Sequence, residues 1–270
     1  MSNKMATLTE ADEQVLAQQV LNQLAPSTYA CSSLNKLSGG TANFLYRGTL
    51  IQPLRRPGED AVTAAAKTVV IKVSTGFVAI NRNFPLDITR CIFEEAMLHA
   101  LVGFPQVIVT SSTHTLVQAP RLYSFDRERH TQILEDFVET TDLTTILESS
   151  SVECTLPGSS SQSVGRTLGL WLRSFHNWAS APAQRELVAQ VGPNKGMRQL
   201  KCLITYDSFI EILVRYPEVI KGYKDTLEHV KAVMKYEFER PVTEGDHTRG
   251  LIHGDFWAGK YAYTFQSHST

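Results

Sequence analysis

The residues of this sequence that could do chemistry gather in a short stretch near its end, residues 251–260. The stretch reads LIHGDFWAGK, an apolar pair followed by His-Gly-Asp, two aromatic residues and a small-residue turn. This pattern predicts a buried strand that runs into a loop and holds the carboxylate of Asp255 at a fixed place. Such a carboxylate can act as a general base, because it accepts the proton of a substrate hydroxyl as the oxygen attacks. The alternative is a capped turn with a solvated aspartate.

A second candidate site is the turn in the sequence LSGGTANFLYR, residues 37–47. Paired glycines between two strands let backbone N–H groups approach phosphate oxygens, because glycine has no side chain to block them. An ordinary hairpin is the alternative. The string LSGG also occurs in the signature of ABC transporter ATPases. That interpretation is rejected, because the chain contains no GxxxxGK[ST] phosphate-binding loop.

Lys72 lies inside the apolar run TVVIKV. Its aliphatic stem can pack in a strand, but a half-buried ammonium needs an anion as its partner. Glu94, in a helix predicted over residues 85–101, is the candidate, since a strand lysine paired with a helix glutamate fixes the α- and β-phosphates of a nucleotide in kinase-like folds. Glu95 is the neighbouring choice, but helical spacing favours Glu94. An edge-strand lysine that points to water is the alternative.

The composition is that of an ordinary globular chain. Its 270 residues carry a formal net charge of -1, with 43% hydrophobic and 20% charged residues. This balance gives no long-range attraction to nucleic acid or acidic membranes, so neither is an expected partner. The cysteines form no CxxC pair, which argues against a zinc site or a disulfide framework. No apolar run reaches the roughly 18 residues of a membrane span, and we expect a cytoplasmic location.

Hydrophobic periodicity predicts an α+β chain in two parts. The first part begins with an amphipathic helix over residues 8–24 and continues as an antiparallel sheet with one further helix. The second part is mainly helical, after a serine-rich segment over residues 149–163 that is interpreted as a mobile insertion. The remaining predicted elements are short strands within 29–73, strands over 106–110, 115–117 and 132–134, and helices over 164–179, 183–191, 196–215 and 222–238.

The chain resembles the aminoglycoside phosphotransferase and choline kinase family, within the protein-kinase-like superfamily, in the ordered segments SGGTANFLYR, VVIKV, IFEEAMLHAL, QILEDF, GRTLGLWLRSFHNW and LIHGDFWAGK. It looks closest to the fungal branch, whose catalytic loop typically reads HGDFWxGN. The resemblance covers residues 37–259 and implies a bilobal α+β fold. Residues 1–28 would form an accessory helix, 29–136 an N-lobe of antiparallel sheet plus helix, 137–260 a mainly helical and incomplete C-lobe, and 261–270 a tail foreign to the family.

The resemblance implies an ATP-dependent kinase acting on a hydroxyl group. Asp255 would be the catalytic base, and Lys72 and Glu94 would position the phosphates. His-Gly-Asp, in place of the His-Arg-Asp of protein kinases, favours an unidentified small hydroxylated molecule as the acceptor. The residues that would contact the nucleotide are Ser38, Gly39, Gly40, Thr41 and Asn43 at the phosphates, and Glu135, Asp136 and Phe137 at the adenine.

The family pattern breaks after the catalytic loop. Where the family has an asparagine that holds Mg²⁺, this chain has Lys260, and an ammonium offers no oxygen to a cation. No Asp, Glu or Asn follows Asp255, so both metal ligands are missing and no metal-binding residue is assigned. The chain is therefore expected to be catalytically impaired, because the metal neutralises the transferring phosphoryl group. A non-catalytic pseudokinase-type binding or regulatory module is the alternative, and an unrelated α+β binding protein is a third.

The break also carries a hypothesis about residues 260–270. Gly259, Lys260 and Tyr261 can be encoded GGT AAG TAY, which contains GTAAGT, the common start of an intron. The tail would then be translated intron, and a genuine truncation is the rival. A spliced transcript that still encodes these residues would end the intron hypothesis.

Overall fold

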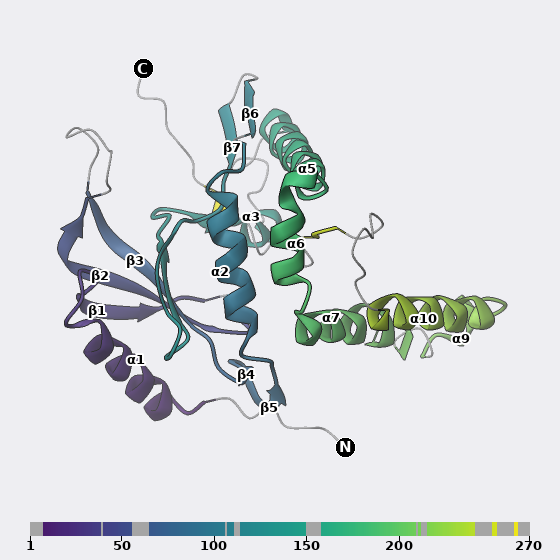
Figure 1. Ribbon diagram of the computed structural model, residues 1–270, viewed down its shortest axis with the longest axis horizontal. Helices are drawn as coiled ribbons and strands as arrows, with labels where there is room; N and C mark the ends of the chain where they lie inside the picture. Colours follow the sequence, from purple (N-terminus) through teal and green to yellow (C-terminus); the bar gives the residue numbers. More distant parts are fainter. Residues whose placement is uncertain are drawn as a thin grey trace. The chain divides into compact units, whose positions relative to one another are not determined.

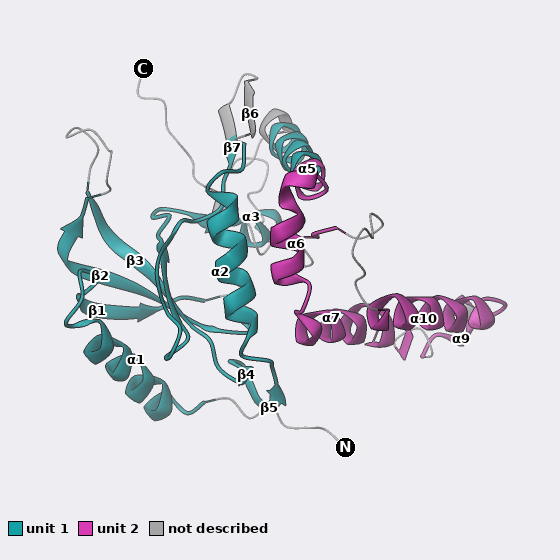
Figure 2. Ribbon diagram, viewed as in Figure 1, with its two compact units in different colours: residues 1–175, 255–270 teal, residues 176–254 magenta. Residues whose placement is uncertain are grey.

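The chain divides into two compact units, Met1–Phe175 with Asp255–Thr270 (unit 1) and His176–Gly254 (unit 2), as Figure 2 shows. Unit 1 contains the sheet, and the described elements of unit 2 are helical. The predicted α+β bilobal kinase-like class is thereby confirmed, while the lobe boundary after residue 136 stays a prediction. The computed structural model describes residues 8–38, 40–55, 65–105, 107–110, 114–149, 158–208, 210–211, 215–240, 250–252 and 262–263.

A five-stranded antiparallel sheet forms the centre of unit 1, in the order β1-β2-β3-β9-β8 (Figure 1). Lys72 of β3 pairs with Leu45 on one neighbouring strand and with Gln132 on the other. Because β3 is a central strand, the edge-strand alternative for Lys72 is excluded. The strands are β1 (Cys31–Lys36), β2 (Phe44–Leu54), β3 (Ala66–Val73), β8 (Leu122–Asp126) and β9 (Thr131–Glu135).

Helix α1 (Glu10–Leu24) covers one face of this sheet (Figure 1). The Thr9 hydroxyl accepts a hydrogen bond from the Asp12 N–H at 3.2 Å, and the Asp12 carboxylate accepts one from the Thr9 N–H at 3.3 Å, so the helix begins with a capping box. Val20 of the helix packs in one core cluster with Ile71 of β3. Burial of this apolar face holds the helix on the sheet.

Helix α2 (Arg90–Leu101) lies on the opposite face of the sheet (Figure 1). The buried side chain of Gln132 on β9 donates from Nε2 to the main-chain oxygen of Cys91 at 3.2 Å. Because successive residues of a strand point to opposite faces, Lys72 points to the α2 side, between core residues that point to α1. The face of the sheet under α1 therefore forms the core, and the face under α2 carries the predicted site.

The other strands of unit 1 form separate two-stranded ladders. Strands form at 107–110 and 114–117, close to the predicted 106–110 and 115–117. Among the described residues they pair only with each other, and β8, which periodicity did not indicate, takes the edge of the main sheet. These ladders are β4 (Phe77–Val78) with β5 (Asn81–Pro85), β6 (Val107–Thr110) with β7 (His114–Val117), and β10 (Thr141–Asp142) with β11 (Ala262–Tyr263).

Two helices follow in unit 1, α3 (Leu143–Glu148) and α5 (Gly158–Ala179), the last of which continues into unit 2. The start of α5 corrects the prediction for residues 158–163, which are helical. Packing near this end of the helix explains this, because Val164 lies in one core cluster with Leu143 and Ile146 of α3. Such tertiary contacts override the weak helix propensity of serine and glycine.

Unit 2 is helical over its described elements. The helix predicted over 196–215 changes into a π-helical stretch, and Lys231 of α10 reaches back to Asp207 of that stretch with an Nζ–Oδ1 distance of 2.9 Å. None of the helices in the described part of the chain has the length and apolar character needed to cross a membrane. The elements are η1 (Pro182–Gln184), α6 (Arg185–Val191), α7 (Lys195–Cys202), η2 (Leu203–Asp207), α9 (Pro217–Ile220) and α10 (Lys224–Glu239).

Gly48 of β2 lies at a tightly packed point of the core. A Cβ atom there would lie 2.6 Å from both Cys31 Sγ and Ile71 Cδ1. We expect Gly48→Ala to lower the free energy of unfolding by about 1–3 kcal/mol, the cost of overpacking. Gly169→Ala, on an exposed part of α5 where a Cβ meets nothing within 4 Å, should raise it by about 0.5–1 kcal/mol. Urea unfolding measures both, and equal effects would contradict the packing described.

Candidate functional site

Lys72 and Glu94, predicted to pair, form an ion pair between β3 and α2 in which Lys72 Nζ donates to Glu94 Oε1. The lysine side chain is 15% exposed and the glutamate side chain 35%. Glu95 is used elsewhere, because its carboxylate pairs with Arg127 at 2.9 Å. The structure therefore selects Glu94 of the two neighbouring carboxylates. An ammonium has three donors, so Lys72 can bind a further anion while it keeps this partner.

The glycine-containing turn between β1 and β2 lies at the same end of the sheet as this ion pair. Leu45, two residues after the turn, is the register partner of Lys72. Gly40 is needed for the shape of the turn, because a Cβ there would lie 2.9 Å from the main-chain oxygen of Asn43. The turn and the ammonium thus lie close enough along the sheet to act on one ligand.

The predicted phosphate-contacting side chains of this turn differ in their surroundings. Ser38 and Thr41 are exposed. Asn43 instead points inward, where its Oδ1 accepts hydrogen bonds from Ser74 Oγ at 3.1 Å and from Arg90 Nη2 at 2.6 Å. Any contact of Asn43 with a ligand therefore has to use its amide nitrogen or its main chain.

Arg90, at the start of α2, is a site residue that sequence reasoning missed. The residue is 7% exposed, and its guanidinium donates to the main-chain oxygens of Thr75 at 2.8 Å, Asp87 at 2.9 Å and Ala42 at 3.4 Å. Burial lowers the pKa of this guanidinium, and the nearby acidic groups oppose that shift. Its spacing from Glu94 could have indicated it, because a residue four positions before Glu94 lies on the same face of the helix.

The segment from Glu135 to Phe137, which begins at the last residue of β9 and is predicted to face the adenine, is held by hydrogen bonds to other parts of the chain. The Glu135 N–H donates to the Arg121 main-chain oxygen at 2.9 Å, and the Phe137 main-chain oxygen accepts from the Thr140 hydroxyl at 2.9 Å. The Glu135 N–H is therefore already in use, whereas the Phe137 oxygen keeps a second lone pair. A planar ring that docks here has to bind that oxygen or the other main-chain groups of the segment.

Asp136 anchors the same segment to the sheet. Its carboxylate accepts two hydrogen bonds from Arg47 of β2, with Nε–Oδ2 and Nη2–Oδ1 distances of 2.7 and 3.0 Å. The Asp136 side chain is 2% exposed and that of Arg47 35%. The arginine spans β3 to reach its partner, since β3 lies between β2 and β9. This bidentate geometry fixes the direction as well as the position of the segment.

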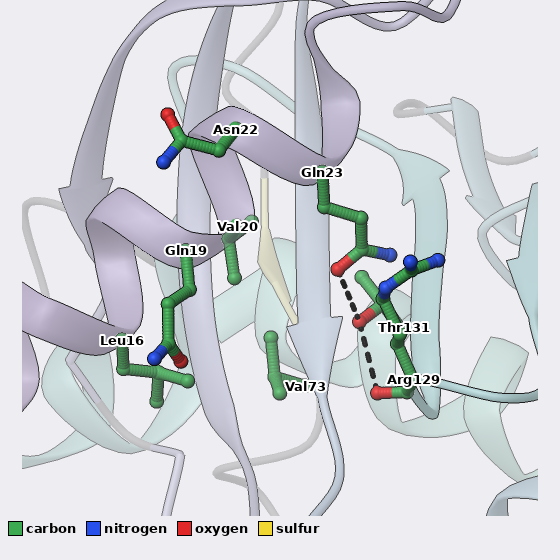
Figure 3. Close-up of a pocket in the computed structure, with 8 residues that line it drawn as sticks. All are labelled: Leu16, Gln19, Val20, Asn22, Gln23, Val73, Arg129 and Thr131. Carbon is green, nitrogen blue, oxygen red and sulfur yellow. Dashed lines mark hydrogen bonds between the residues drawn. The ribbon is translucent and has the colours of Figure 1, made fainter.

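A hollow of about 480 Å³ lies between α1 and the sheet (Figure 3). Its sheet wall includes Val73 and Thr131, which neighbour Lys72 and Gln132 in sequence and therefore face the opposite side. Arg129, a cation in its lining, pairs with an aspartate at 2.9 Å. This hollow is separate from the predicted site residues.

The predicted catalytic base Asp255 lies outside the described residues, as do Gly39 and Lys260. Over the part of the chain that the structure describes, no group of three or more His, Cys, Asp or Glu side chains could hold a metal ion. The position at which the family holds its metal falls outside that part. The assignments of Asp255 and Gly39 therefore stay predictions.

Comparison with known proteins relates the chain to a phosphotransferase. No protein-family profile matches the chain. Over 259 residues, 93% of the chain, the sequence is 27% identical to the phosphotransferase FrzJ of a Cladobotryum species. The chain spans 64% of the length of that relative. This similarity over most of the chain supports a phosphotransferase family.

Removal of Arg47 tests the anchor of the segment after β9. Arg47→Met leaves the buried Asp136 carboxylate without its guanidinium, and we expect the free energy of unfolding to fall by about 2 kcal/mol, less than for a fully buried pair because Arg47 is partly exposed. Arg127→Met, which removes a guanidinium that is 67% exposed from its pair with Glu95, should cost less, at most about 1 kcal/mol. Urea unfolding compares the two variants. Equal costs would contradict an anchoring role.

Proposed function

We propose that the chain is an aminoglycoside-phosphotransferase-like kinase domain of the fungal type, which binds ATP on the α2 side of its sheet. By lineage it would transfer the γ-phosphoryl group to a hydroxyl group of a small molecule. The observation that carries the proposal is the ion pair between Lys72 on a central strand and Glu94 on the helix that covers it. The similarity to a phosphotransferase over 93% of the chain supports it independently.

The phosphate end of the proposed site combines a fixed cation with a glycine-containing turn. Glu94 holds the Lys72 ammonium in place and leaves it donors for the phosphate oxygens. Charge-assisted hydrogen bonds of this kind are among the stronger ones in proteins. The turn that contains Gly40 lies at the same end of the sheet and can add backbone N–H groups.

The adenine end of the proposed site lies along the neighbouring strand. Lys72 pairs with Gln132, and Glu135 is three residues further along β9. At the rise of an extended strand this separation is on the order of 10 Å, the scale of a nucleoside 5′-phosphate. The segment from Glu135 to Phe137 is thus at a suitable distance for a purine ring whose phosphates meet Lys72.

The transfer itself is assigned to Asp255. In the proposed reaction its carboxylate accepts the proton of the acceptor hydroxyl while that oxygen forms a bond to the γ-phosphorus, and the bond from phosphorus to the ADP oxygen breaks. The Mg²⁺ of the family would neutralise the transferring group, but Lys260 stands at a ligand position and its ammonium does not fit a cation. We therefore assign no step to the metal and propose that this chain transfers phosphate poorly.

Lys260 also favours a second candidate function, a non-catalytic module that binds nucleotide for regulation. Such a module would keep Lys72, Glu94 and the turn but would gain nothing from magnesium. Magnesium dependence separates the two functions. A lower Kd for ATP in the presence of magnesium, together with turnover, would support the enzyme. A Kd that is the same with and without magnesium would support the module.

Replacement of Lys72 tests the proposed ATP site directly. We expect Lys72→Met to raise the Kd of a fluorescent ATP analogue at least about tenfold, because charge-assisted hydrogen bonds to the phosphates are lost. Lys67→Met removes an exposed lysine of the same strand on the other face, and it should leave the Kd within about twofold. Titration by fluorescence anisotropy measures both. Equal Kd values for the two variants, or no saturable binding by the unaltered chain, would refute the site.

A further inference from the structure

Arg90 contacts three separate segments around the proposed phosphate site. Nη2 donates to Ala42 and Asn43 of the glycine-containing turn, and Nη1 donates to the main-chain oxygens of Thr75, after β3, and Asp87, before α2. The acceptors lie between 3 and 48 residues from Arg90 along the chain. A single side chain therefore joins the turn, the end of the lysine strand and the beginning of the glutamate helix.

The geometry of these contacts calls for a guanidinium. The four acceptors are neutral oxygens, and each terminal nitrogen of Arg90 serves two of them. A guanidinium presents its donors in a rigid plane, so it fixes the relative orientation of the segments it joins, whereas a lysine ammonium is a single flexible donor group. A cation that is only 7% exposed is costly to bury without such partners.

Helix α2 connects this contact to the ion pair. Arg90 and Glu94 are four residues apart and share one face of the helix. Glu94 holds the Lys72 ammonium, and Arg90 holds the turn. The Ser74 hydroxyl adds a second link, because it donates to the same Asn43 oxygen from a position two residues after Lys72.

We infer that Arg90 is a positioning residue, which holds the glycine-containing turn at a fixed distance from Lys72 so that the turn's backbone N–H groups and the ammonium meet the same nucleotide phosphates. This inference rests on the proposed ATP site and adds to it a residue that does not itself touch the nucleotide. Without Arg90 the turn would open locally while the sheet stays folded.

Hydrogen–deuterium exchange of the unliganded chain tests whether Arg90 holds the glycine-containing turn in place. In Arg90→Met and Arg90→Lys we expect the amides of residues 40–45 to exchange at least about tenfold faster, while those of β9 keep their protection. Arg127→Met, which removes an arginine that pairs with Glu95 of the same helix, should leave the turn unchanged. Failure of lysine to restore protection would show that the planar guanidinium is required.

The ATP affinity of the same variants tests whether this positioning of the turn matters for nucleotide binding. We expect the Kd of the fluorescent ATP analogue to rise about tenfold in both Arg90 variants and to stay unchanged in Arg127→Met. If Arg90→Met does not fold, Asn43→Ala removes one acceptor, leaves the carbonyl contacts, and should still speed exchange in the turn. Unchanged exchange in folded Arg90→Lys and Asn43→Ala overturns the inference.

The remaining outcomes separate this inference from the proposed function. If the unaltered chain binds the ATP analogue and Arg90→Lys binds it equally well, the positioning role is wrong and the ATP site stands. If Lys72→Met and the unaltered chain both fail to bind, the ATP site is wrong and the positioning role falls with it.

Discussion

An ammonium on the central strand of a sheet needs a carboxylate within reach, and this requirement fixes where helix α2 packs. Lys72 is 15% exposed, so an unpaired charge there would destabilise the fold. The helix meets the requirement with Glu94 and adds two further links on the same side, from Cys91 to Gln132 and from Arg90 to the turn. Because one helix makes all three contacts, strand, helix and turn form a single pre-organised unit.

The pairing of Lys72 with Glu94 could be predicted because a charge inside an apolar strand is a strong local signal with few partners. The capping box of α1 is a local feature of the same kind, since Thr9 and Asp12 are three residues apart. Arg90 could not be predicted in the same way. Its acceptors lie up to 48 residues away along the chain and are mostly main-chain oxygens, which carry no sequence signal.

Strand patterns showed where strands exist but not which sheet they join. The strands β6 and β7 have the expected apolar character, yet within the part of the chain that the structure describes they pair only with each other, and β8 occupies the sheet edge. Hydrophobic periodicity predicts which residues of a strand point to each face of the sheet, but it does not predict which strands lie beside it. The carboxylate anchor of Asp136 was missed for the same reason, because its partner Arg47 lies across β3. Asp255 stays a sequence prediction, as it lies outside the described residues.

The proposed nucleotide binding and the proposed phosphoryl transfer would depend on different parts of this chain, and the central claim concerns nucleotide binding. An adenosine that carries an amine-reactive sulfonyl fluoride at its 5′ position tests it most directly, because the reactive group would lie where the phosphates are proposed to bind. Peptide mapping by mass spectrometry is expected to find the modification on Lys72 and its loss in excess ATP. Modification of exposed lysines such as Lys67 with Lys72 unmodified, or labelling that ATP does not prevent, would contradict the account.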